Sequence, residues 1–224
     1  MTSPEPDISS LLAETQEFTE ETDNPDLHVL TQAWLNEKSA PELLPFQGII
    51  VEDLIELLES QASIANELST QNVNNAFIAM LYQTEMERVK YLIRSYLRTR
   101  LSKIEKDIFY IMKNEEYAGR LSDAELRYAQ MYHDLLESHF RKSCLDSLPA
   151  WMQRLDDRTS DLNRTSNMIN PPDLERAVFC RVKENIGEFQ LSENASVVLD
   201  VNNIFILRYC TIQNLLAEQK VELI

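Results

Sequence analysis

The feature that most constrains the fold of this chain is an uninterrupted stretch from about Asn74 to Met112 that contains neither glycine nor proline. Its apolar residues recur at helical spacing, so the stretch predicts one long α-helix. A helix of ~40 residues is long for a globular protein, in which three or four turns are usual. A chain with such a helix is expected to be mainly α-helical in this part.

Three more helices are predicted from apolar periodicity and from start and stop signals, over residues 25–40, 49–68 and 122–145. Asn24 can cap the first of them, with Pro25 at its first position. The last opens with Ser122-Asp-Ala-Glu125, a capping box in which each side chain satisfies a backbone N–H group of the other residue. Four helices in succession predict a helical bundle.

The character of the sequence changes after Pro149. Residues 154–173 are polar, with Pro171-Pro172 near their end, which predicts a linker. Segments rich in β-branched or aromatic residues then predict short strands at 177–182, 196–201, 205–209 and 220–224, with a short helix from Thr211 to Ala217.

The expected fold class is therefore mainly α with a small β-rich C-terminal domain. An N-terminal helical bundle includes one long central helix, and a linker leads to the short-stranded β domain. The expected boundaries are an acidic tail at residues 1–24, a helical domain at 25–150, a linker at 151–173 and a β-rich domain at 174–224.

Charge and hydropathy argue against several classes of protein. The chain carries 21 Lys and Arg against 37 Asp and Glu, a formal net charge of −16 that repels a phosphate backbone. No apolar run reaches the ~20 residues that a membrane span requires. The first ten residues lack the basic and apolar regions of a secretion signal. We therefore expect a protein without membrane contact that stays on the reducing side of the membrane.

Motifs for catalysis, cofactor binding and metal binding are absent from the sequence. Its three glycines are too few for a glycine-rich phosphate loop. His133 and His139 are six positions apart, which places them on different helix faces and not at zinc-binding spacing. The many acidic residues are interpreted as a solvated surface. We expect no enzyme activity and no cofactor.

The acidic tail contains one apolar cluster, Ile8, Leu11 and Leu12, at the spacing of one face of a short helix. Such a cluster among acidic residues is typical of tail motifs that fold into the groove of a partner. The alternative interpretation is a stray helical turn without a function.

The segment from Arg88 to Lys106 has seven basic residues and one acidic residue, Glu105. One interpretation is a nucleic-acid-binding module that uses this basic central helix. However, the cations do not gather on one face; they surround a broad apolar stripe. The stripe consists of Leu92, Ile93, Tyr96, Leu97, Leu101 and Ile104.

Arg100 falls inside this stripe. An arginine in such a position is usually paired with a carboxylate, in a core or at an interface, because an unpaired buried charge is costly. We therefore favour a helix that contacts a partner protein over a helix that binds DNA.

Two stretches have specific patterns of residue identity. One is Ala33-Trp-Leu-Asn-Glu-Lys-Ser-Ala-Pro-Glu-Leu-Leu44, and the other is 83–106, with its Met-Glu-Arg, Ser-Tyr-Leu-Arg-x-Arg-Leu and Lys-Ile-Glu-Lys elements. Weaker similarity continues at 178–182, 208–212 and 221–224. These stretches resemble the signatures of the Sld-five family of subunits of the GINS complex, and the resemblance covers about residues 25–224.

The resemblance implies a structural subunit without catalytic activity. GINS is a heterotetramer of related subunits, each with a helical domain and a small β domain. The tetramer joins the MCM hexamer and the Cdc-forty-five protein in the replicative helicase and helps to connect DNA polymerase epsilon. The implied protein is nuclear and acts in initiation and elongation of chromosomal replication. Its implied partners are the three other GINS subunits and, through the complex, these replication proteins, with no direct sequence-specific contact to DNA.

Candidate contact residues follow from the central helix and from the first signature. They are Trp34, Tyr96, Leu97, Arg98, Arg100, Leu101 and Ile104. Some family members also carry a tail motif that binds a trimeric replisome hub protein. Residues 9–15 resemble this motif, with serines at the two leading acidic positions and Thr15 at the last leucine. Ile8, Leu11 and Leu12 are therefore the candidate hub-binding residues.

Overall fold

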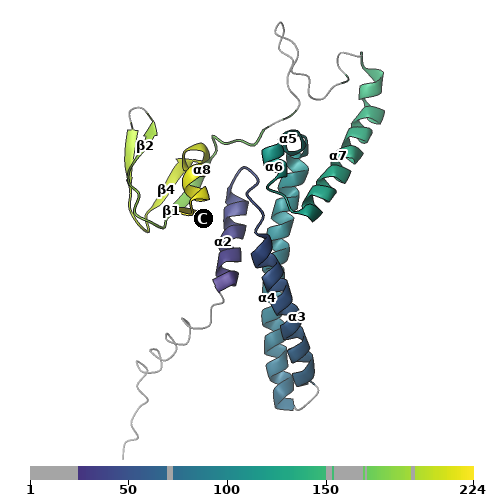
Figure 1. Ribbon diagram of the computed structural model, residues 1–224, viewed down its shortest axis with the longest axis vertical. Coiled ribbons are helices and arrows are strands. Elements are labelled where there is room, and N and C mark those ends of the chain that lie inside the picture. Colours follow the sequence, from purple (N-terminus) through teal and green to yellow (C-terminus); the bar gives the residue numbers. More distant parts are fainter. Residues whose placement is uncertain (1–24, 70–72, 150–152, 154–168, 170, 193–194) are drawn as a thin grey trace, which may run out of the picture. The chain divides into compact units, whose positions relative to one another are not determined.

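The computed structural model describes residues 25–69, 73–149, 153, 169, 171–192 and 195–224. Its helices are α2 (Pro25–Ser39), α3 (Gly48–Ser69), α4 (Val73–Lys106), α5 (Ile108–Lys113), α6 (Glu115–Ala118), α7 (Asp123–Ser143), the 3-10 helix η1 (Leu145–Ser147) and α8 (Tyr209–Ala217) (Figure 1). Its strands are β1 (Ala177–Val182), β2 (Gly187–Ser192), β3 (Ala195–Leu199), β4 (Ile204–Arg208) and β5 (Val221–Leu223). The predicted fold class, a helical bundle followed by a small antiparallel β region, is confirmed.

Several predicted features lie outside the described residues. They include the candidate tail motif with Ile8, Leu11 and Leu12, the cap at Asn24 and most of the linker. The division into a helical domain, 25–150, and a β-rich domain, 174–224, stays a prediction.

The chain divides by its internal contacts into two compact units. The first unit comprises Met1–Thr31 and Ile49–Val89, and the second comprises Gln32–Gly48 and Lys90–Ile224. The division falls inside α2 and α4, so each of these helices contributes to both units.

In the first unit, α3 and the first half of α4 run antiparallel to each other (Figure 1). The buried residues of α3 are Val51, Leu54, Leu58 and Ala65. Their spacing of three, four and seven residues places them on one face, which explains why this stretch forms an amphipathic helix.

The prediction of one helix from about Asn74 to Met112 is wrong at its C-terminal end. The helix stops at Lys106, and Asp107 separates it from α5 with backbone angles of φ −109° and ψ 23°. Aspartate is a poor residue for a helix interior and favours the position before a helix start. After this break, Ile108 and Ile111 join Ile104 in a buried cluster that also contains Leu43, Tyr117 and Ala129.

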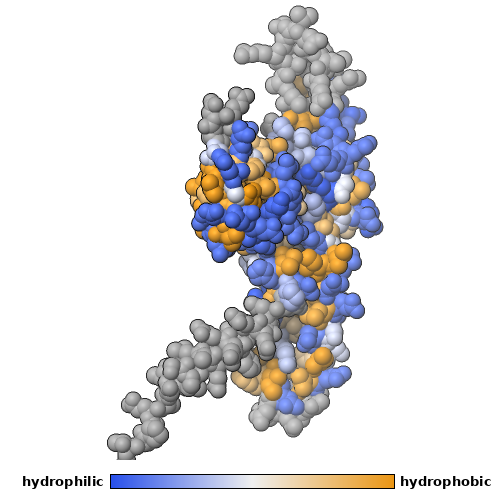
Figure 2. Space-filling model, turned by 60° about the vertical axis from the view of Figure 1, so that its left-hand side comes forward, coloured by the Kyte–Doolittle hydropathy of each residue, from blue (hydrophilic) through white to orange (hydrophobic). Residues whose placement is uncertain are grey.

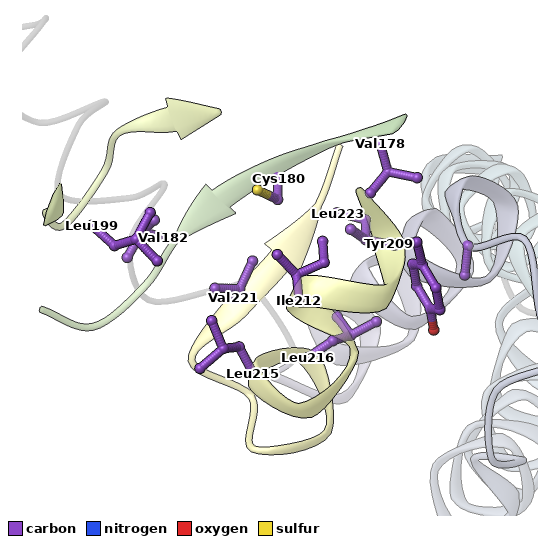
Figure 3. Packing of buried hydrophobic residues seen from close by; sticks show 11 residues of the cluster. Val178, Cys180, Val182, Leu199, Tyr209, Ile212, Leu215, Leu216, Val221 and Leu223 are labelled. Atoms are coloured by element: carbon purple, nitrogen blue, oxygen red, sulfur yellow. The ribbon is translucent and has the colours of Figure 1, made fainter. Parts of the chain in front are cut away.

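The β-rich part of the second unit is built around β1, which pairs antiparallel with β4 on one side and with β5 on the other. Alternation along β1 buries Val178, Cys180 and Val182 and exposes the residues between them. Helix α8 covers the buried face of this sheet and contributes Ile212 and Leu215 to its core (Figure 3).

Strand β2 was not expected from the sequence. It pairs with β3 in a separate two-stranded sheet, and Phe189 and Leu191 are its only large apolar residues. Gly187 begins the strand with φ +75°, a left-handed conformation that favours glycine. The formation of β2 therefore depends more on its pairing with β3 than on the β propensity of its own residues. A prediction based on apolar runs does not find such a strand.

Candidate partner interface

Arg100 is fully buried within the second unit, and each of its five N–H donors has an acceptor. Glu125 accepts two hydrogen bonds, from Nε at 2.8 Å and from Nη2 at 3.0 Å. Glu37 accepts one from Nη1 at 3.2 Å. The remaining bonds go to the backbone carbonyls of Leu44, at 2.6 Å, and Arg120, at 3.1 Å. The guanidinium thus joins α2, α4 and α7 with the loop after α2.

The predicted capping box positions the main partner of Arg100. Ser122 accepts a hydrogen bond from the backbone N–H of Glu125 at 3.2 Å, and Glu125 accepts one from the backbone N–H of Ser122 at 3.0 Å. This prediction is confirmed. The same Glu125 carboxylate therefore caps α7 and binds Arg100.

The electrostatics of this cluster follow from its burial. Burial by itself would lower the pKa of Arg100, but the hydrogen bonds and charge of Glu125 and the charge of Glu37 outweigh it, so the pKa is raised. Lys103 donates to Glu37 at 2.8 Å and to the carbonyl of Glu42 at 2.7 Å. Burial lowers the pKa of Lys103, and Glu37 only partly opposes this effect. Both cations are thus tied to the structure of the chain itself.

Glu42 is a second buried carboxylate and connects the helical residues with α8. It accepts hydrogen bonds from the hydroxyls of Tyr117 and Tyr209, both at 2.7 Å, and from Gln213 at 2.8 Å. Arg120 donates to it at 2.9 Å. Four donors thus meet at one carboxylate, which satisfies both of its oxygen atoms.

The end of α2 also binds the open edge of the sheet. Strand β5 is an edge strand, and the side chain of Asn36 accepts a hydrogen bond from the backbone N–H of Leu223 at 2.8 Å. Gln32 donates to the carbonyl of Leu223 at 3.0 Å, and Ser39 donates to that of Ile224 at 3.1 Å. Covering an edge strand in this way prevents it from pairing with another chain.

These contacts explain the first sequence signature in physical terms. Asn36 binds the sheet edge, Glu37 binds Arg100 and Lys103, and Glu42 binds the two tyrosines. The polar residues of this motif thus hold together segments that lie far apart in the sequence.

Alkaline pH is expected to weaken the second unit through Tyr117 and Tyr209. Burial and then the neighbouring Glu42 raise the pKa of both phenols above the ordinary value of 10.0. Above pH 10 the unfolded chain therefore binds fewer protons than the folded chain, and the free energy of unfolding falls as the pH rises.

We expect Tyr117→Phe/Tyr209→Phe to show a flatter decline of the free energy of unfolding between about pH 9 and about pH 11, because neither position can then ionise. Urea melts at several pH values measure this slope. Tyr91→Phe, at an exposed position of α4, is the control and should keep the slope of the unchanged chain. Equal slopes for all three proteins would contradict the role assigned to Glu42.

The structure distributes the predicted contact residues over different environments. Tyr96, Arg100 and Ile104 lie in the core of the chain. Trp34 is half-buried and donates to the hydroxyl of Thr99 at 3.3 Å. Leu97 and Leu101 are also half-buried, whereas Arg98 is exposed. A role of these residues in binding a partner subunit stays a prediction.

The basic character of the central helix is partly used inside the chain. Arg100 and Lys103 bind Glu37, and Arg88 forms an exposed pair with Glu85 at 2.6 Å. These contacts leave fewer cations for a phosphate backbone than the sequence suggests, which weakens the nucleic-acid-binding alternative.

A larger apolar surface lies on residues that were not singled out from the sequence. We call it the α3–α4 apolar surface; it consists of the exposed side chains of Ile55, Leu57, Ile64, Phe77, Ile78, Met80, Leu81 and Tyr82. Phe77 is 63% exposed and Met80 is 65% exposed. Figure 2 shows apolar surface interrupting the hydrophilic surface of these helices, in the lower part of the view. Helix α4 has apolar residues on most of its circumference here, a pattern that could have indicated contacts beyond the chain.

The outer face of the β4-β1-β5 sheet is a second exposed apolar surface. Phe179 lies opposite Ile206 in the register of β1 and β4, and the two side chains are 55% and 61% exposed. Ile204 and Ile224 are exposed as well. A sheet whose two faces are both apolar is typical of one that is covered on both sides.

None of the described helices is long and apolar enough to cross a membrane. No cluster of three or more His, Cys, Asp or Glu side chains in the described part of the chain could hold a metal ion.

Comparison with known proteins gives a consistent result along the chain. The family model for the "DNA replication complex GINS protein SLD5 C-terminus" matches residues 172–224, and that for the "GINS complex protein helical bundle domain" matches residues 49–143. The chain is 37% identical over 219 residues to the DNA replication complex GINS protein SLD5 of Schizosaccharomyces pombe, covering 97% of this chain and 99% of that protein.

Other organisms have similar proteins of the same name. The SLD5 protein of Dictyostelium discoideum is 34% identical over 211 residues, which cover 91% of this chain and 95% of the relative. That of Homo sapiens is 34% identical over 206 residues, which cover 87% of each chain. The chain therefore belongs to the SLD5 family of subunits of the GINS DNA-replication complex.

Proposed function

We propose that this chain is a non-catalytic scaffold subunit of a GINS heterotetramer. In this proposal the tetramer acts in the nucleus within the replicative helicase, with the MCM hexamer and the Cdc-forty-five protein, in initiation and elongation of chromosomal DNA replication. The names of the curated relatives support membership in the complex. The observation that carries the scaffold role is the α3–α4 apolar surface.

This surface is difficult to reconcile with a chain that works alone. Phe77, Met80 and Leu81 are each more than half exposed and lie within one and a half turns of α4. Soluble monomers rarely expose contiguous apolar patches of this kind, whereas obligate subunits cover them with a partner. Helices of another subunit that pack along α3 and α4 would bury these side chains, as expected for a heterotetramer of helical subunits.

Phe77→Asp/Met80→Asp is expected to reduce the yield of the co-expressed complex roughly tenfold or more, because each change places an unpaired charge in a contact that must become dry. Both positions are exposed in the chain, so its own fold should be kept. Size-exclusion chromatography with light scattering, after co-expression with the other three GINS subunits, measures the complex, and circular dichroism checks the fold.

The matched control is Gln83→Asp/Thr84→Asp, which introduces the same charges at exposed polar positions of the same helix. This control should assemble normally. Equal yields of complex from both double variants would show that the α3–α4 apolar surface does not bind the partner subunits.

DNA polymerase epsilon and a trimeric hub protein of the replisome are two further candidate partners. We propose that the complex contributes to the connection with DNA polymerase epsilon, and that the tail segment with Ile8, Leu11 and Leu12 binds a trimeric hub protein of the replisome. A labelled peptide of residues 1–24, titrated with that hub protein, tests the second of these proposals. Ile8→Ala/Leu11→Ala/Leu12→Ala in the peptide should abolish the binding.

The rival function, nucleic-acid binding through the basic central helix, is separated from the scaffold role by its salt dependence. Binding through phosphate contacts must weaken steeply as salt rises, in proportion to the number of phosphates neutralised. A complex with strong, steeply salt-dependent affinity for DNA that is lost in Arg94→Gln/Arg98→Gln would favour the rival.

A further inference from the structure

A hollow with a volume of about 590 Å³ lies on the second unit. It is bordered by the end of α2, by the last turns of α4 and by the residues just before β1. Five of the side chains that line it are basic: Lys38, Arg98, Lys103, Lys106 and Arg176. Two are acidic, Asp107 and Asp173, so the hollow is strongly positive in a chain whose net charge is −16.

Most of these cations form no ion pair within the described structure, although the charges of Lys106 and Lys103 act on Asp107 in the same hollow. Lys103 lies deepest, with 14% of its side chain exposed, and is already bound to Glu37. Among the residues that the structure describes, Lys38, Arg98, Lys106 and Arg176 form no ion pair, although acidic residues greatly outnumber basic ones in the chain. By contrast, Arg208 of the same unit is exposed and pairs with Glu175 at 3.0 Å. A concentration of unpaired like charges is unfavourable by itself and indicates a site for an anionic group.

The hollow suits carboxylates on a flexible peptide better than a nucleic acid. The net charge of −16 repels a long phosphate backbone, whereas a short peptide feels mainly the local positive charge, because salt screens charges beyond ~10 Å. Asp107 and Asp173 would face a continuous row of phosphates, but the carboxylates of a peptide can be spaced to avoid them. The hydroxyl groups of Thr99 and Ser102 add hydrogen-bond donors of the kind that a carboxylate accepts.

We propose that this basic hollow binds the acidic N-terminal segment of the same chain, residues 5–23. Seven of the first 24 residues are acidic: Glu5, Asp7, Glu14, Glu17, Glu20, Glu21 and Asp23. The described structure begins at Pro25, the first residue of α2, so this segment is covalently attached to the helix that ends beside Lys38. Such attachment gives an effective concentration on the order of millimolar, at which weak charge pairs suffice for binding.

The proposal does not depend on the proposed function. The site would keep the tail on the body of the subunit, and a partner that binds the tail has to displace it. Binding of the tail in the hollow would therefore weaken the apparent affinity of that partner for the tail. The partner can bind only the fraction of molecules in which the tail has left the hollow.

The test uses the full chain in its co-expressed complex and a fluorescein-labelled peptide of residues 1–24 as the probe. In the unchanged chain the hollow is expected to be occupied by the chain's own tail, so it should bind the labelled peptide weakly. A chain whose seven tail carboxylates are changed to amides should bind it roughly tenfold or more tightly, because the competing segment no longer carries charge. Adding Arg98→Gln/Lys106→Gln/Arg176→Gln to this chain should abolish the gain.

The matched control adds Arg127→Gln/Lys142→Gln/Lys183→Gln instead, which removes the same number of positive charges at exposed positions outside the hollow and should keep the tight binding. Equal binding by the two triple variants would show that the hollow is not the site. Equal binding by the wild-type chain and the amide-tail chain would show that the tail is not its occupant. Displacement of the probe by a 24-nucleotide single strand at lower concentration than by unlabelled peptide would overturn the choice of a peptide over a nucleic acid.

Discussion

Arg100→Ala is expected to lower the free energy of unfolding by about 3–5 kcal/mol, the range found when one partner of a buried ion pair is removed. Glu37 and Glu125 would remain buried without the guanidinium, and the carbonyls of Leu44 and Arg120 would lose a donor. Most domains have a total stability of only about 5–15 kcal/mol, so the change should remove a large fraction of the free energy of unfolding. Urea denaturation of the variant and of the unchanged chain measures the difference.

Two further variants identify the cause of the loss. Arg100→Lys keeps the charge but offers a single nitrogen in place of the planar group, so it should restore only part of the stability. Arg98→Ala removes an arginine two positions earlier on the same helix, where the side chain is exposed, and should change stability by less than about 0.5 kcal/mol. A melting curve of Arg100→Ala that coincides with that of Arg98→Ala would refute the role given to the buried cluster.

Glu42→Ala is expected to cost a similar amount, about 3–5 kcal/mol, because it leaves Arg120 without its buried counter-charge and removes the acceptor shared by Tyr117, Tyr209 and Gln213. The loss should also separate α8 from the helical residues of the second unit. Proteolysis should then cut near residues 174–176 faster than in the unchanged chain.

The chain provides a control that touches the same arginine. Arg120 also pairs with Glu116 at 2.7 Å, but the side chain of Glu116 is 77% exposed. Glu116→Ala should therefore cost less than about 1 kcal/mol, as exposed ion pairs do. If Glu42→Ala were no more damaging than Glu116→Ala, the Glu42 cluster would not be what holds α8 in place.

The sequence predicted the elements that are marked by local signals. The capping box at Ser122 and Glu125 needs only two residues three positions apart, and the strand β1 needs only alternation over six residues. The presence of a carboxylate partner for Arg100 was also predictable, because a guanidinium inside an apolar stripe must be neutralised.

The identity of that partner was not predictable, since Glu37 and Glu125 lie 63 and 25 positions from Arg100. The end of α4 at Lys106 was missed because the apolar pattern continues across Asp107 into α5, where Ile108 and Ile111 join the cluster of Ile104. The α3–α4 apolar surface was missed for a related reason. Periodicity finds apolar residues, but only a structure shows which of them the chain itself buries.

The long sequence separation of the Glu42 contacts has a consequence for protein synthesis. Tyr209 follows Glu42 by 167 positions and Gln213 follows it by 171. At a translation rate of roughly 5–20 residues per second, the ribosome needs on the order of 10–30 s to make the intervening chain. During that interval Glu42 and the polar side chains at the end of α2 have no strand or α8 to bind, so the second unit can close only after residues 209–223 have left the ribosome.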